Sequence, residues 1–187
     1  LTAAVCADVI AASRASAGSL AARQTRRLGA LLAAAGAHSP MYRPLLAHRD
    51  VARIPLGELP IVRKPELMRR FDEWVGDPEI RLDEVRRFIA DPVNIGAPFL
   101  GRYMVWESSG STGEPAVFIQ DAAAMATYDA LEGLRKPDLR PTRRWFDPCG
   151  LSERIVFVGA TGGHFASTVS IERLRRLNPL LASSVHS

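Results

Sequence analysis

The chain has 187 residues, of which 47% are hydrophobic and 24% are charged, and its net charge is +4. This composition is that of a globular protein with one ordinary domain or two small ones, and no run approaches the roughly 18 apolar residues of a membrane span. The charge is carried largely by arginines dispersed among acidic residues, which favours a solvated surface over a nucleic-acid site and would also suit an anionic substrate.

The N-terminal residues show no secretory signal, because Asp8 interrupts the only apolar stretch that could form one. Cys6 and Cys149 are far apart in the sequence, which favours reduced thiols over a disulfide framework or a metal site. We therefore expect a cytoplasmic protein, and we assign no metal ligand.

The first part of the chain has a helical pattern. Residues 2–35 are rich in alanine and carry leucines at helical spacing, which predicts a long helix or a helix pair with Gly18 and Gly29 as weak points. Ser39 followed by Pro40 is typical of a helix start, so we expect a short helix there.

A proline-punctuated segment over residues 54–65 is expected to be extended and to lead into a helix over 66–71. A further amphipathic helix is predicted near 81–90. We interpret residues 1–100 as an N-terminal helical region with extended crossings.

A loop rich in serine and glycine, residues 107–115, lies between the apolar runs 103–106 and 116–119. Both runs have the β-branched and aromatic residues typical of strands, so the loop joins strand to strand. Glycines allow φ > 0 and close approach of a ligand, and successive N–H groups in such a loop can hold an anion. A flexible surface hairpin has a similar composition and is the alternative. The expected phosphate-binding residues are Ser108, Ser109, Gly110, Ser111, Thr112 and Gly113.

Beyond the hairpin the pattern is α/β. Asp121 can cap a helix over 122–136, whose Met125, Tyr128 and Leu131 are expected to form a core stripe. The apolar run 155–158 is typical of a strand in a parallel sheet. A glycine turn follows, and then a helix that carries Ile171, Leu174 and Leu177 and stops at Asn178 and Pro179. Strand, turn and helix form half of a βαβ unit.

Two other kinds of nucleotide site also use glycine-rich turns. A nucleoside-triphosphatase P-loop needs a Gly-Lys pair and a following helix, and the loop at 107–115 has neither. The glycines Gly159, Gly162 and Gly163 resemble a dinucleotide-binding turn, as in NAD(P)-dependent dehydrogenases. Phe165 stands at the third glycine position of that motif, and no acidic strand end follows about 20 residues later. The dinucleotide site remains an alternative.

The loop at 108–115, SSGSTGEP, resembles the phosphate-binding loop of the adenylate-forming enzymes, [ST]-S-G-[ST]-T-G-x-P. The absence of a Lys-Gly pair after Pro115 resembles the phenylacetate–CoA ligase branch, as does the order of SPMYRPLL, LP and the loop. Glu114 stands where that branch often has lysine. The segment Gly163, His164 and Phe165 resembles the turn that lines the acyl pocket. The resemblance implies that His164 contacts the substrate carboxylate or shapes the pocket; a structural histidine that caps the next helix is the alternative.

The resemblance implies the N-terminal portion of an ATP-dependent ligase that forms an acyl-AMP and then a thioester. Residues 101–187 would be the first part of an incomplete α/β AMP-binding domain, a mixed sheet flanked by helices. Implied cofactors and partners are ATP, Mg²⁺, CoA or a carrier thiol, and an aryl or aryl-acetic acid. No nucleic acid or membrane is expected, and a homodimer is possible. Catalytic residues are expected beyond residue 187, so this piece alone should be inactive. A catalytically incomplete nucleotide-binding remnant is the second alternative.

Overall fold

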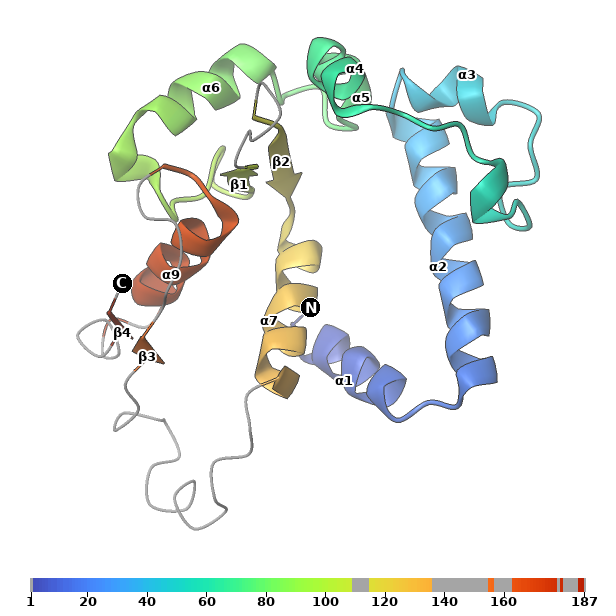
Figure 1. Cartoon of the computed structure of the whole chain (residues 1–187), viewed down its shortest axis with the longest axis horizontal. Coiled ribbons are helices and arrows are strands. Elements are labelled where there is room, and N and C mark those ends of the chain that lie inside the picture. The colour runs from blue at the N-terminus through green and yellow to red at the C-terminus, as the bar shows by residue number, and fades with distance from the viewer. Residues whose placement is uncertain are drawn as a thin grey trace. The chain divides into compact units, whose positions relative to one another are not determined.

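The computed structural model describes residues 2–108, 115–135, 155–156, 163–177, 179 and 185–186. These residues form a mixed, helix-rich α/β structure with a small two-stranded antiparallel sheet (Figure 1). The chain divides into two compact units: unit 1 comprises Leu1–Ile10 and Arg86–Ser187, and unit 2 is Ala11–Val85. The boundary expected at residue 100 falls inside unit 1.

The predicted helix pair is present as α1 (Thr2–Ser13) and α2 (Ala17–His38). The break between the two helices does not fall at a glycine. Ser16 is the N-cap of α2, and its side-chain oxygen accepts a hydrogen bond from the Ser19 N–H at 3.2 Å. A serine at this position satisfies one of the free N–H groups of the first turn. Gly18 and Gly29 both lie within α2.

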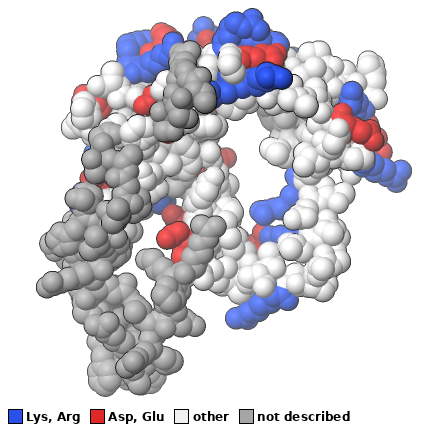
Figure 2. Space-filling view, in the orientation of Figure 1, with Lys and Arg blue, Asp and Glu red and all other residues white. Residues whose placement is uncertain are grey.

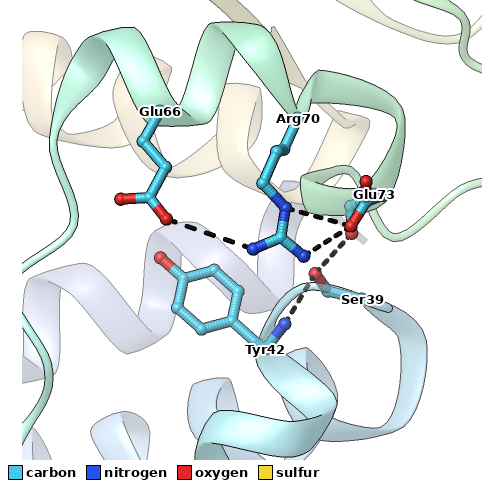
Figure 3. A network of polar contacts seen from close by, with 5 residues as sticks. All are labelled: Ser39, Tyr42, Glu66, Arg70 and Glu73. Carbon is cyan, nitrogen blue, oxygen red and sulfur yellow. Dashed lines mark hydrogen bonds and ion pairs between the residues drawn. The ribbon is translucent and has the colours of Figure 1, made fainter.

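The short helix expected after Ser39 is α3 (Tyr42–Leu46), but it begins two residues later than a Ser39 cap implies, because Met41 is its N-cap and no side chain caps it. The Ser39 carbonyl accepts from the Arg43 N–H at 3.0 Å, and the hydroxyl donates to the Glu73 carbonyl at 2.9 Å. Figure 3 shows this hydroxyl between Tyr42 and Glu73, next to the Arg70–Glu73 ion pair. Ser39 thus ties the first turn of α3 to another segment of unit 2.

The extended crossing holds a single 3₁₀ turn, η1 (Leu56–Glu58), and the predicted helix after it is split into α4 (Lys64–Arg69) and α5 (Phe71–Trp74). The helix predicted near 81–90 is α6 (Leu82–Ala90). The buried apolar side chains of unit 2 include Leu32, Met41, Leu46, Met68, Phe71, Ile80 and Val85.

Unit 1 contains the predicted hairpin. After the 3₁₀ turn η2 (Pro92–Asn94), β1 (Met104–Glu107) pairs antiparallel with β2 (Val117–Gln120), so that Met104 faces Gln120 and Glu107 faces Val117. Each strand lies one residue later than predicted. The loop 108–115 therefore connects strand to strand.

Helix α7 (Ala122–Arg135) follows β2 directly (Figure 1). The predicted cap is confirmed, because Asp121 Oδ1 accepts from the Ala124 N–H at 2.7 Å. The predicted core stripe is wrong at two of its three positions: Met125 is buried, but Tyr128 is 52% exposed and Leu131 is 41% exposed. The helix buries Ala126 and Ala130 instead, and Tyr128 makes an edge-to-face contact with Trp106.

The strand and the helix of the predicted half βαβ unit are both present. β3 (Ile155–Val156) precedes α9 (Ala166–Leu177) and pairs in parallel with β4 (Val185–His186), a strand that was not predicted. The rest of the predicted strand, residues 157–158, lies outside the described residues. Val169 of α9 packs with Met104 and Met125, which joins the helix to the hairpin.

On the face shown in Figure 2, Lys and Arg side chains lie next to Asp and Glu side chains, so charges of both signs are mixed on it. Within the described parts of the chain, every helix is too short or too polar to cross a bilayer.

Candidate functional site

The base of the hairpin loop is closed by Ser108. Its N–H donates to the Ala116 carbonyl at 2.9 Å, and its hydroxyl oxygen accepts from the Ala116 N–H at 2.9 Å. A hydroxyl that accepts one bond keeps its own hydrogen to donate. Ser108 is the one predicted phosphate-binding residue within the described part; Ser109, Gly110, Ser111, Thr112 and Gly113 lie outside it.

The predicted acyl-pocket segment lies against this base. The Glu107 N–H donates to the His164 carbonyl at 2.7 Å, and Glu107 forms a parallel bridge with Phe165. The last residue of β1 is therefore flanked by β2 and by the segment that opens α9. The base of the loop at Ser108 and the turn at 163–165, which were predicted separately, therefore lie at the same end of the hairpin.

Gly163 shapes the turn before α9. Its φ is +80°, a conformation that favours glycine, and the residue is exposed. The half-buried Phe165 ring lies 3.7 Å from the position that a Cβ on Gly163 would occupy. The turn therefore holds the aromatic ring beside an exposed stretch of backbone.

His164 is the least expected feature of the site. Its side chain is 1% exposed, and neither ring nitrogen has a hydrogen-bond partner among the described residues. The ring is tilted against Phe88 at a centroid distance of 5.8 Å. The alternative that this side chain caps α9 is wrong, because no such hydrogen bond is made.

Burial lowers the pKa of His164, and the nearby backbone of Asn94 and Ile89 offsets part of this shift. The fold therefore holds the neutral imidazole. Because the unfolded chain takes up the proton more readily, this residue favours unfolding as the pH falls through about 6.5, the ordinary histidine value.

Two substitutions of His164 distinguish the effect of losing its side-chain volume from the effect of losing its polar ring nitrogens. We expect His164→Ala to lose about 2–4 kcal/mol of unfolding free energy, because it leaves a cavity. His164→Leu should stay within about 1 kcal/mol of the parent at pH 7.5, because it fills the space and removes two unpaired buried nitrogens. It should also flatten the loss of stability between pH 7.5 and 5.5. Urea denaturation at both pH values measures these differences. Equal losses in both variants at pH 7.5 would show that the ring nitrogens have partners in solution.

Glu107 was not predicted as a site residue. Burial raises the pKa of its carboxyl, so the group holds its proton to a higher pH than an exposed glutamate. The sequence offers one signal for it: an acidic residue that ends a strand immediately before Ser108. Glu107 and Ser108, which lead into the loop in the sequence, carry oxygen atoms of the type that Mg²⁺ prefers.

Among the described residues, no group of three or more His, Cys, Asp and Glu side chains is placed to hold a metal ion. Comparison with protein families, with curated proteins and with solved structures finds no match to this chain.

Proposed function

We propose that residues 108–113 bind the phosphates of ATP in a carboxylate-activating, AMP-forming ligase of which this chain is the N-terminal portion. The observation that carries the proposal is that the serine–glycine loop connects β1 to β2 at the end where His164 and Phe165 join the hairpin. Residues 1–100 would be the helical N-terminal region, and 101–187 the first part of an AMP-binding domain with a mixed sheet.

The reaction would proceed in two steps. A carboxylate oxygen attacks the α-phosphorus of ATP, the bond to pyrophosphate breaks, and acyl-AMP forms. The sulfur of CoA or a carrier thiol then attacks the acyl carbon and displaces AMP, which gives a thioester. An aryl or aryl-acetic acid fits the resemblance of the loop to the phenylacetate–CoA ligase branch.

In this scheme the loop contributes to catalysis by positioning the phosphates of ATP and stabilising their negative charge. Its N–H groups and hydroxyls hold the β- and γ-phosphates, and Ser108 contributes a hydroxyl hydrogen at the base. A bound Mg²⁺ would neutralise phosphate charge. The buried, neutral ring of His164 would shape the wall of the acid's pocket through Phe165 rather than bind the carboxylate itself.

The dinucleotide-binding alternative gains no support from the second parallel strand. In such a site the strand after the glycine turn and helix ends in an acidic residue that binds ribose. Here the described strand that follows α9 is β4, and its residues Val185 and His186 include no acidic side chain.

Carboxylate-dependent exchange of pyrophosphate into ATP tests the proposal. We expect the natural full-length protein to catalyse the exchange with at least one member of a panel of benzoates, aryl acetates and alkanoates, and not without acid. ATP binding without exchange on any acid would favour the nucleotide-binding remnant. Absence of both binding and exchange would contradict the phosphate assignment as well.

A further inference from the structure

A pocket lies in unit 1, at the end of the hairpin opposite Ser108. Its volume is about 340 Å³, which is within the range of small-molecule sites. We propose that it binds an organic monoanion: a carboxylate with a short apolar body. The pocket does not include the phosphate loop, so this inference stands apart from the ligase proposal.

The floor of the pocket is apolar. Met104 of β1 and Met125 and Ala126 of α7 line it, and all three side chains are buried. Methionine side chains adapt to irregular shapes, and their thioethers are polarisable. Such a floor would accept an alkyl or aryl group and would offer a charged head nothing to bind.

The rim is positively charged. Arg102, Arg173 and Arg176 line the pocket together with a single described carboxylate, that of Asp129. Arg173 holds this carboxylate with two parallel hydrogen bonds of 2.7 and 2.8 Å. One acid is therefore matched by one arginine, and Arg176 on the rim carries a further positive charge.

Arg176 has donors to spare. Arg176 donates one N–H to the Val93 carbonyl at 2.8 Å, and the Arg102 guanidinium lies 5.1 Å from the centre of the Tyr103 ring. A guanidinium carries five N–H donors in a fork that matches a carboxylate. The pocket thus combines an apolar floor with the group that best recognises a carboxylate.

This pocket is separate from the phosphate loop. Met104 is the first residue of β1 and Ser108 follows the last, which places the two ends about 13 Å apart at the usual strand rise. A ligand in the pocket and a nucleotide at the loop could therefore be bound independently.

The methionines provide the test. The chain has four: Met104 and Met125 line the pocket, whereas Met41 and Met68 belong to unit 2. The full chain, labelled with [methyl-¹³C]methionine, is titrated with hexanoate and, separately, with the uncharged isostere hexanamide. We expect hexanoate to shift the Met104 and Met125 methyl signals in a saturable way, to leave Met41 and Met68 in place, and to bind at least tenfold more tightly than hexanamide.

Two arginine variants of α9 complete the experiment. Arg176→Gln should weaken hexanoate binding about tenfold. Arg175→Gln removes the same charge one residue away, from an arginine that pairs with Glu172 and does not line the pocket, and should bind like the parent. The proposal is overturned if all four methionines shift alike, if none shifts, if hexanamide binds as tightly as hexanoate, or if the two variants bind equally.

Discussion

Replacing Thr112 or Gly110 with valine is expected to slow ATP–pyrophosphate exchange by the natural full-length protein about 100-fold, the usual effect of removing one aligned donor to a reacting group. Valine has the shape of threonine without the hydroxyl that would donate to a phosphate oxygen. At position 110 a branched side chain would occupy the space in which backbone N–H groups meet the anion. The measurement is the exchange rate as a function of ATP concentration, with the preferred acid at saturation.

Matched controls lie in α7, in the same unit. Thr127→Val removes a hydroxyl that donates to the Ala123 carbonyl at 3.0 Å, and Gly133→Val adds a side chain where a Cβ meets nothing within 4 Å. Both should exchange at rates close to that of the parent. If the loop variants behave like these controls, residues 108–113 do not hold the phosphates of ATP.

Elements with a local chemical signal could be predicted from the sequence. Asp121 caps α7 because its carboxylate reaches an N–H three residues ahead. The hairpin strands follow from β-branched and aromatic residues on both sides of a turn-forming loop. Each of these signals acts within a few residues, so neighbouring structure does not override it.

The buried face of α7 could not be predicted. Large apolar residues suggested a stripe through Tyr128 and Leu131, but the helix packs through Met125 and two alanines, Ala126 and Ala130. Alanine gives a weak hydrophobic signal and yet permits close approach of a neighbouring element. Which face is covered depends on α9 and β1, which are distant in the sequence.

The candidate site also combines local features that could be predicted with a long-range contact that could not. The composition of the loop and of the turn indicated each segment, but their meeting depends on the bond from the Glu107 N–H to the His164 carbonyl. The burial of the His164 ring and the raised pKa of Glu107 arise from that packing. A long-range strand contact of this kind has no signature in a single sequence.

The largest stability effect is expected at Gly96. Its φ is +73°, and a Cβ there would lie 2.6 Å from Glu172 Cβ and 2.7 Å from the Arg173 backbone nitrogen. The loop after η2 therefore lies directly against the backbone of α9, which cannot move aside as a flexible side chain would. Gly96→Ala should lose about 3–4 kcal/mol of unfolding free energy, the combined cost of left-handed strain and overpacking.

Gly101→Ala separates these two costs. Gly101 has a φ of +71°, nearly that of Gly96, but a Cβ there meets nothing within 4 Å. It should lose only the strain, about 1–2 kcal/mol. Urea denaturation of both variants gives the difference, which measures the contact between the loop and α9. Equal losses of stability would mean that the loop does not rest on the helix backbone.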